Sequence, residues 1–171
     1  MQERQGVITL QGNPMTLVGP ELKVGEAAPD FTVTANDLSP VEFSSYRGKV
    51  CVISSVPSLD TPVCDTQTRR FNEEAGKLGD DVAILTLSVD LPFAQARWCG
   101  AAGVDKTQAL SDYKDVSFGA AYGLLIKELR LLARAVLVVD KEGVIQYFQL
   151  VKEVGEEPDY DAALEAVKKL A

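Results

Sequence analysis

The residues best able to do chemistry in this chain are its three cysteines, Cys51, Cys64 and Cys99, because the sequence contains no histidine. The absence of histidine excludes Ser-His-Asp and Cys-His catalysis, and every metal site that depends on imidazole. A cysteine that acts as a nucleophile must therefore become a thiolate without the help of a histidine base. The cysteines form no CxxC pair and are too few for a structural zinc cluster. Thiol chemistry without a bound metal is the first expectation.

Cys64 lies where an apolar, β-branched run gives way to a helical pattern. The segment 57–64 reads PSLDTPVC, in which Pro57 ends the run, Thr61 is a suitable helix N-cap and Pro62 suits the first helical position. Cys64 is then expected in the first turn, where free N–H groups and the positive end of the helix dipole favour a thiolate. A lone cysteine near a helix start is also often just a small buried residue.

The other two cysteines are expected in different surroundings. Cys99 stands at the end of a short predicted helix, where the dipole gives a thiolate no help. Cys51 lies inside the run KVCVISSV, where a cysteine usually behaves as a small hydrophobic residue. Core packing is therefore the expectation for Cys51, and a side disulfide under heavy oxidation is the alternative.

The elements that must position these cysteines alternate between strands and helices. Buried strands are predicted at 49–56 and 82–89, with a helix over about 62–78 between them. A short helix should follow from Pro92, capped by Asp90 and ended by Gly100. The other predicted elements are an N-terminal hairpin (7–10 and 15–18), a strand at 135–139, a turn at 140–143, a strand at 144–151 and a helix at 159–170. The stretch 101–133 gives mixed signals.

This order of elements predicts an α/β protein with a thioredoxin-like fold. Strands joined through a helix should be parallel, whereas the late hairpin should be antiparallel, so the central sheet is mixed and flanked by helices. We expect a single thioredoxin-like domain over residues 1–171, with residues 1–20 as an N-terminal β-hairpin extension. Thioredoxins carry a CxxC pair at the strand-to-helix corner, but here Thr61 stands in place of the first cysteine. A local dithiol centre therefore cannot form.

The pattern PxxxTxxC, formed by Pro57, Thr61 and Cys64, resembles the active-site motif of the peroxiredoxins. The N-terminal hairpin, the segment 93–99 (FAQARWC) and the segment 131–136 (LLARAV) are similar to the thiol peroxidase branch of bacterial peroxiredoxins. The resemblance thus extends over nearly the whole chain.

The resemblance implies a role for each of five residues. Cys64 would be the peroxidatic cysteine, which attacks peroxide as a thiolate and becomes a sulfenic acid. Thr61 would hydrogen-bond the thiolate and the peroxide, and Pro57 would shield the pocket from water. Arg134, which alone would be interpreted as a surface cation, would stabilise the thiolate and the leaving oxygen. Without histidine, that oxygen's charge must in any case be met by fixed donors. Cys99 would resolve the sulfenic acid by forming an intramolecular Cys64–Cys99 disulfide.

The resemblance also implies an enzyme, a thioredoxin-dependent peroxiredoxin that reduces hydrogen peroxide and organic hydroperoxides without a cofactor. Thioredoxin is the expected reductant and a homodimer the expected assembly. Two other functions remain open. One is a peroxiredoxin of the bacterioferritin-comigratory kind, whose resolving thiol is placed differently. The other is a redox-relay or peroxide-sensing module that passes its disulfide to a partner protein.

The charge and hydropathy patterns limit which binding partners and which cellular compartment we expect for this protein. Lys and Arg number 17 against 25 Asp and Glu, which gives a net charge of -8. With no basic block, nucleic acid and anionic membranes are poor partners. No apolar run approaches the ~18 residues of a membrane span, and the first residues lack the apolar core of a signal peptide. We therefore expect a cytoplasmic protein whose thiols stay reduced until they react.

Overall fold

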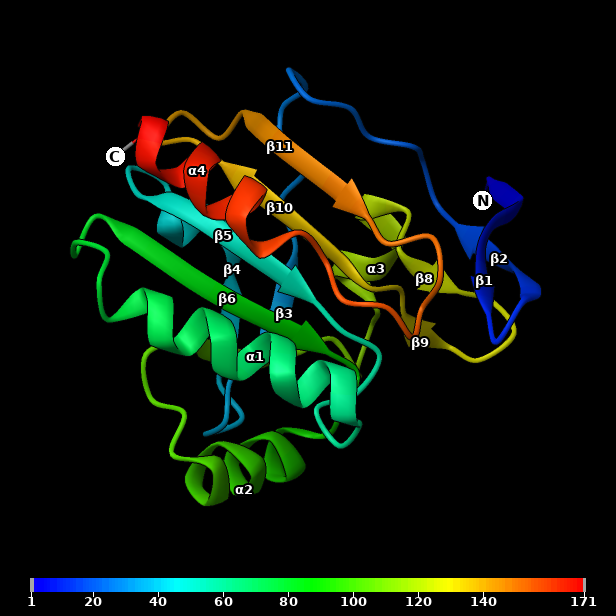
Figure 1. The fold of residues 1–171 in the computed structure, drawn as a ribbon, viewed down its shortest axis with the longest axis horizontal. Helices are drawn as coiled ribbons and strands as arrows, with labels where there is room; N and C mark the ends of the chain where they lie inside the picture. Colours follow the sequence, from blue (N-terminus) through cyan, green and yellow to red (C-terminus); the bar gives the residue numbers. More distant parts are fainter. Residues whose placement is uncertain (1, 171) are drawn as a thin grey trace.

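The computed structural model describes residues 2–170, which form a large mixed sheet with helices on both faces and a smaller second sheet (Figure 1). The seven strands of the large sheet follow the order β11-β10-β5-β6-β7-β3-β4, and the four of the small sheet the order β1-β2-β8-β9. The strands are β1 (Glu3–Leu10), β2 (Asn13–Val18), β3 (Thr32–Thr34), β4 (Pro40–Glu42), β5 (Val50–Ser55), β6 (Val82–Ser88), β7 (Gln108–Ser111), β8 (Leu125–Ile126), β9 (Leu131–Leu132), β10 (Ala135–Val139) and β11 (Ile145–Leu150). The helices are α1 (Pro62–Ala75), α2 (Pro92–Ala102), α3 (Ser117–Tyr122) and α4 (Tyr160–Leu170), with a short 3-10 turn at Phe43–Tyr46. The predicted mixed sheet, its flanking helices and the N-terminal hairpin are all present.

Strand β5 lies inside the large sheet, between β10 and β6, and all of its residues are buried. It runs parallel to β6 and antiparallel to β10, as the strand–helix–strand order and the late hairpin predicted. Successive side chains of a strand point to opposite faces. Val52 accordingly packs in the apolar cluster that includes α1 and α4, whereas Cys51 and Ile53 pack in the cluster on the other face.

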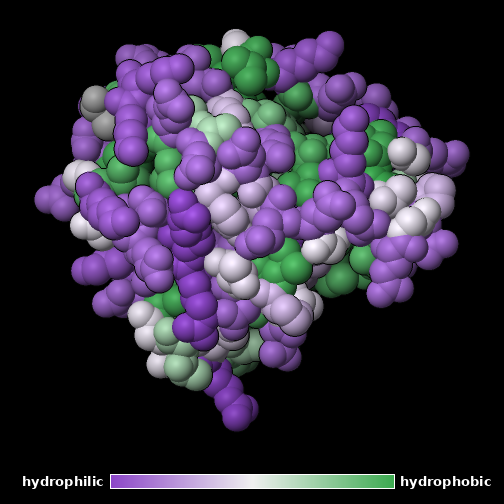
Figure 2. All heavy atoms as spheres, viewed as in Figure 1, coloured by the Kyte–Doolittle hydropathy of each residue, from purple (hydrophilic) through white to green (hydrophobic). Residues whose placement is uncertain are grey.

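The helices cover the two faces of this sheet unequally. Helices α1 and α4 lie in front of it in the view of Figure 1, where Phe71 and Leu164 contribute to their shared apolar cluster. On the opposite face α3 supplies Phe118 and Tyr122, which pack with Phe31. Polar and charged side chains cover much of the outer surface over α1 and α4 (Figure 2). Helix α1 is therefore buried along one side only, the side from which Cys64 points inward.

Both ends of α2 differ from the prediction. Asp90 is not the cap, because the N-cap position is Leu91, and the Asp90 carboxylate accepts hydrogen bonds from Ser58 and from the Leu59 N–H. The helix also continues past Gly100 to Ala102 and ends at Gly103, whose φ of 70° is the left-handed conformation that suits glycine at a helix end. A side chain can cap a helix only if its oxygens are not already bonded elsewhere. Those of Asp90 are bonded to the loop before α1.

The stretch 101–133, which gave mixed signals, contains short elements joined by tight loops. It supplies β7, which extends the parallel part of the sheet beside β6, and it supplies α3. It also supplies β8, which pairs with β2 of the N-terminal hairpin, and β9, which pairs with β8. The N-terminal hairpin is therefore part of a second sheet, in which β2 pairs with both β1 and β8. No helix between residues 2 and 170 has the length and apolar character needed to cross a membrane.

Candidate active site

Cys64 is the third residue of α1, as predicted, and its side chain is fully buried at 0% exposure. Helix α1 begins at Pro62 directly after the loop that follows β5. The N–H of Asp65 donates to the carbonyl of Thr61 over 2.9 Å. The N–H groups of Val63 and Cys64 come too early in the helix to reach a carbonyl within it. Cys64 therefore sits at the positive end of the helix dipole, an environment that stabilises an anion.

The Arg134 guanidinium reaches the sulfur of Cys64. Its terminal nitrogen NH2 donates to Cys64 Sγ over 3.2 Å, and the side chain is only 2% exposed. The sequence motif alone allowed a surface cation at this position, but the structure places Arg134 inside the protein. The structure thus brings Arg134 and Cys64 into contact.

Sheet register explains how two residues so far apart in the sequence meet. Strand β10 pairs antiparallel with β5, and Ala135 lies opposite Ser55. The residue one step before Ala135, which is Arg134, therefore lies beside the point where the chain leaves β5 for the loop that leads to Cys64. Strands β5 and β10 are completely buried, so they hold Arg134 in this position relative to the loop that leads to Cys64.

Two further groups hold the guanidinium in place, and the sequence analysis missed both. Nε of Arg134 donates to the carbonyl of Val154 over 2.8 Å, and NH1 donates to Oε1 of Gln67 over 2.9 Å. Gln67 is fully buried, and its amide donates in turn to Ser54 over 2.7 Å. Gln67 follows Cys64 by three residues and therefore lies on the same face of α1. This spacing could have identified Gln67 as a neighbour of Cys64 from the sequence. The Val154 carbonyl is a backbone group, so no residue type indicates its role.

The charge of Arg134 has no carboxylate partner in the described part of the chain. None of the ion pairs among residues 2–170 includes this arginine. A buried guanidinium without a counter-charge is costly, since neutral acceptors replace only part of its hydration. The Cys64 sulfur lies 3.2 Å from a terminal nitrogen of this guanidinium. Arg134 therefore offers a buried positive charge directly beside the sulfur.

Thr61 and Pro57 border the site in different ways. Thr61 occupies the N-cap position of α1, but its side chain makes no capping hydrogen bond and donates instead to the carbonyl of Ser58 over 2.9 Å. The side-chain cap expected from Thr61 is therefore absent. Pro57 is buried directly after Val56, which packs against Cys64. The Asp90 carboxylate then fixes the loop by accepting from Ser58 Oγ over 2.7 Å.

Cys99 is not in contact with Cys64 in this structure. It lies on α2, partly exposed, and lines a cavity of about 560 Å³ with residues of the 35–41 loop and of the 104–109 segment. Its neighbour Trp98 is the residue of α2 that packs against Cys64. Burial raises the pKa of the Cys99 thiol, which agrees with a position away from the helix start. In this form the two cysteines therefore face different parts of the molecule.

Cys51 is a core residue. It is 2% exposed on β5, and burial raises the pKa of its thiol to about 11. A thiol in this state is protonated and shielded, which matches the expectation of core packing.

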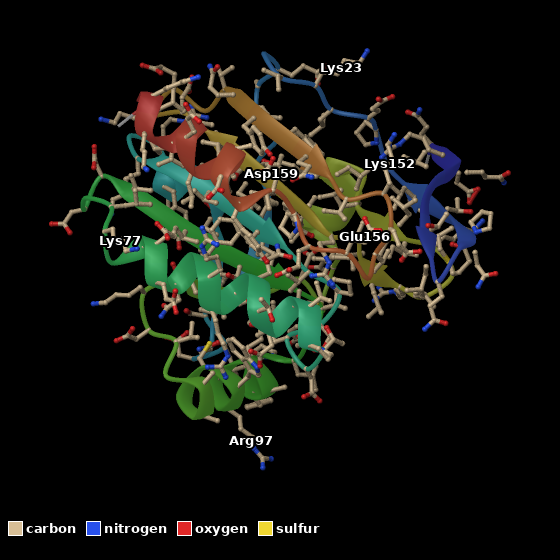
Figure 3. The ribbon with its side chains drawn as sticks, viewed as in Figure 1. Lys23, Lys77, Arg97, Lys152, Glu156 and Asp159 are labelled. Carbon is tan, nitrogen blue, oxygen red and sulfur yellow. The ribbon has the colours of Figure 1, made fainter. Side chains whose placement is uncertain are left out.

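A second cavity, also of about 560 Å³, lies between the loop before α1 and the face of α2 that carries Ala94 and Trp98. Leu59 and Trp98 line it, and both also pack in the cluster that contains Cys64. Arg97 stands at its border, with a side chain that projects away from the body of the molecule (Figure 3). Between residues 2 and 170 no group of three or more Cys, Asp or Glu side chains is arranged to hold a metal ion.

The chain is similar in sequence to a family of known proteins. The family model described as Redoxin matches residues 23–164. The thiol peroxidase of Bacillus subtilis is 58% identical over 163 residues, which cover 95% of this chain and 97% of that protein. The thiol peroxidase of Halalkalibacterium halodurans is 59% identical over 161 residues, which cover 94% of this chain and 96% of that protein.

A solved structure shows the same fold. The peroxiredoxin-like protein from Aquifex aeolicus superimposes with a TM-score of 0.91 at 44% sequence identity, and the match covers 97% of this chain and 98% of that one. The thioredoxin-like class expected from the order of elements is thereby confirmed. By its family match and its identity to these relatives, the chain belongs to the redoxin family and, within it, to the thiol peroxidases.

Proposed function

We propose that Cys64 is the residue at which this thiol peroxidase reduces its hydroperoxide substrate. The observation that carries the proposal is the contact of Arg134 with the buried Cys64 sulfur over 3.2 Å, in a site where the guanidinium has no other anion beside it. The Cys64 thiolate attacks the nearer oxygen of the hydroperoxide. An S–O bond forms as the O–O bond breaks, so Cys64 becomes a sulfenic acid and the leaving oxygen departs as an alkoxide or hydroxide that takes up a proton.

Fixed donors meet the charge that develops on the leaving oxygen. The Arg134 guanidinium shares its donors between Cys64 and neighbouring acceptors, so it can follow the charge from sulfur to oxygen without moving far. The hydroxyl of Thr61 already donates to Ser58, which leaves its lone pairs free to accept the O–H of a bound hydroperoxide. Donors held in place before the reaction stabilise such charge without reorganisation at the moment of bond breaking. Pro57 keeps water out of the same corner.

Cys99 is proposed to resolve the sulfenic acid. Its sulfur attacks the sulfur of Cys64, the S–O bond breaks, and the hydroxyl leaves with the thiol proton as water. The product is an intramolecular Cys64–Cys99 disulfide. Thioredoxin is the proposed reductant of this disulfide, since a protein dithiol can exchange with it through a mixed disulfide. This resolving thiol on α2 is the feature that separates the proposal from a bacterioferritin-comigratory kind of peroxiredoxin.

The alternative function is a redox relay that hands its disulfide to a partner protein. Turnover with thioredoxin, thioredoxin reductase and NADPH distinguishes the two functions. A peroxidase consumes NADPH in proportion to added peroxide over many turnovers, and this is the expected result. A relay oxidises a partner once per chain and leaves NADPH consumption at the level of the uncatalysed control, which would contradict the proposal.

A homodimer is proposed as the assembly. Leu91 and Phe93, at the start of α2, are 52% and 66% exposed and form apolar surface that a second copy can cover. The mass in solution tests this, and a Phe93→Asp variant should shift the protein toward the monomer. A wild-type protein that is monomeric at every concentration would contradict it.

A further inference from the structure

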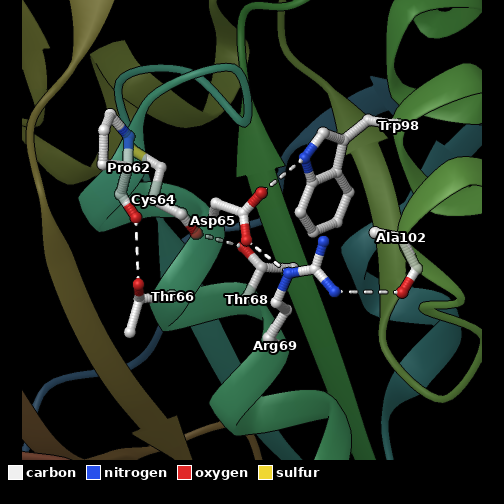
Figure 4. A network of polar contacts seen from close by, with 8 residues as sticks. All are labelled: Pro62, Cys64, Asp65, Thr66, Thr68, Arg69, Trp98 and Ala102. Carbon is white, nitrogen blue, oxygen red and sulfur yellow. Dashed lines mark hydrogen bonds and ion pairs between the residues drawn. The ribbon is translucent and has the colours of Figure 1, made fainter.

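A hydrogen bond joins two residues that are sequence neighbours of the proposed redox cysteines. Asp65 follows Cys64 and Trp98 precedes Cys99, and the indole nitrogen of Trp98 donates to Oδ2 of Asp65 over 3.2 Å (Figure 4). Trp98 also packs against the buried cluster that contains Cys64. The indole is therefore the part of α2 that lies beside the first turn of α1.

Arg69 ties this pair together. Its Nε donates to the other carboxylate oxygen of Asp65, and its NH1 donates to the carbonyl of Ala102 over 3.2 Å (Figure 4). The guanidinium also lies 5.8 Å from the centre of the Trp98 ring, within the range of a cation–π interaction. We refer to Asp65, Arg69, Trp98 and the Ala102 carbonyl as the α1–α2 latch.

The latch holds α2 in an orientation that keeps Cys99 away from Cys64. Adjacent residues of a helix point in directions about 100° apart, so Cys99 turns away when Trp98 faces α1. Cys99 accordingly lines the cavity beside the 35–41 loop. A disulfide requires Cα atoms within about 7 Å and side chains that face each other. Helix α2 must rotate or unwind to meet this requirement, and either movement takes the indole away from Asp65.

We propose that Asp65, Arg69 and Trp98 are positioning residues for the resolving step, and that opening of the α1–α2 latch limits the rate at which Cys99 reaches oxidised Cys64. The inference rests on the proposed function, in which Cys99 is the resolving cysteine. While the latch is closed, the sulfenic acid on Cys64 remains available to a second hydroperoxide. That reaction transfers one oxygen to sulfur, which becomes a sulfinic acid, and reduces the second hydroperoxide to water or an alcohol. The latch therefore sets the balance between resolution and overoxidation.

The chain offers a matched pair of variants on one helix. Arg69→Ala removes the guanidinium that links Asp65 to the Ala102 carbonyl and to the Trp98 ring, while the direct hydrogen bond from Trp98 to Asp65 can still form. Arg70→Ala is the control, because Arg70 also makes ion pairs and lies 5.3 Å from an aromatic ring, but its partners are Glu74 of α1 and Asp161 and Tyr160 of α4, and none belongs to α2. Trp98→Phe is a third variant, which keeps an aromatic ring against Cys64 and loses only the indole donor.

Trp98 is the only tryptophan of the chain, so its fluorescence reports the latch directly. After rapid mixing with peroxide, the wild-type protein should show one phase whose rate rises with peroxide and a slower phase whose rate does not. In Arg69→Ala the slower phase should become about three- to tenfold faster, as expected for loss of an exposed ion pair and a cation–π contact. In Arg70→Ala it should keep the wild-type rate. Rapid quenching and mass measurement follow the same step in Trp98→Phe, which should also resolve faster.

The second readout is overoxidation, which a purely structural contact leaves unchanged. The peroxide concentration that converts half of the chains to sulfinic acid should rise in Arg69→Ala and Trp98→Phe by the same factor as the resolution rate. Equal resolution rates and equal overoxidation in Arg69→Ala and Arg70→Ala would overturn the latch while leaving the proposed function intact. A peptide map of the wild-type protein without a Cys64–Cys99 disulfide would overturn both, and the map identifies this outcome separately.

Discussion

The guanidinium of Arg134 donates to the sulfur of Cys64 over 3.2 Å. No carboxylate among residues 2–170 forms an ion pair with this guanidinium. Gln67 and the Val154 carbonyl hold the other edges of the guanidinium, so its position does not depend on the cysteine. The guanidinium is therefore held beside the Cys64 sulfur by groups other than the sulfur itself. Under the proposed function, this fixed positive charge does the work for which the chain has no histidine.

Replacement of Cys64 by Ser should reduce peroxide consumption to the background level, because an alcohol in the same place is not ionised and cannot attack the O–O bond. Cys51→Ser is the control of matched chemistry and should retain most of the activity. Cys51 lies in the core of β5, where burial raises the pKa of its thiol to about 11. Peroxide consumption with a dithiol reductant measures both variants. Equal losses would show that Cys64 has no special role.

Removal of the guanidinium should slow the first step. Arg134→Ala is expected to react with peroxide about 10²- to 10³-fold more slowly, the usual cost of losing a donor aimed at developing charge. Arg134→Lys should recover only part of this rate, since an ammonium group cannot contact Gln67 and Cys64 from one plane. Stopped-flow rates and the thiolate absorbance of Cys64 at neutral pH provide the measurement. Wild-type values for both in Arg134→Ala would remove Arg134 from the site.

Glu153 should make stability depend on pH in the acid range. Its carboxylate accepts hydrogen bonds from the N–H groups of Gly155 and Gly12 and from Thr9, which lowers its pKa from 4.5 to about 2. Because the folded-state pKa lies below the ordinary value, this stabilisation is present above pH 4.5 and is lost as the pH falls toward about 2. The same loop carries the Val154 carbonyl that holds Arg134.

Thermal unfolding of Glu153→Gln at a series of pH values tests this expectation. The variant should be less stable than the wild-type protein at neutral pH, and the difference should shrink as the pH falls through this window. Glu156→Gln, which changes an exposed carboxylate of the same loop, is the control and should follow the wild-type curve. A constant difference between Glu153→Gln and wild type down to pH 2 would contradict the assignment.

Oxidation should loosen the two helices that carry the cysteines. Cys99 and Cys64 face different parts of the reduced protein, so disulfide formation requires the first turn of α1 and most of α2 to move. Helix α2 has 11 residues and is cheap to unwind, since a helix this short is marginal in water on its own. Hydrogen exchange should show amides of 61–68 and 92–100 losing protection in the disulfide form. Strands β5 and β10 should stay protected, and full protection of both helices would contradict the movement.

The long apolar elements and the position of Cys64 were predictable because local chemistry determines them. Strands β5 and β10 are continuous buried runs, and their β-branched, apolar sequences predict strands that are covered on both faces. The Thr61-Pro62 pair set the start of α1 to the residue, which put Cys64 in its first turn. The resemblance then directed attention to Arg134, for which local pattern alone predicted a surface position.

The parts that sequence could not provide depend on contacts between distant segments. Strands β8 and β9 have two residues each; β8 pairs with β2 of the N-terminal hairpin, and β9 pairs with β8. Asp90 was expected to cap α2, but its carboxylate accepts a hydrogen bond from Ser58, in the loop that follows the neighbouring strand β5. The Val154 carbonyl is a backbone group, so no residue type reveals that it binds Arg134. The orientation of Cys99 likewise follows from the packing of Trp98, which no spacing rule gives.

The most direct test of the mechanism is the mass of the wild-type protein after one equivalent of hydrogen peroxide, followed by peptide mapping without reduction. We expect a loss of two hydrogens from each chain, with one disulfide that joins the peptides of Cys64 and Cys99, while Cys51 remains a free thiol. A disulfide through Cys51, a link between chains, or a sulfenic acid that persists on Cys64 with Cys99 still free would contradict it.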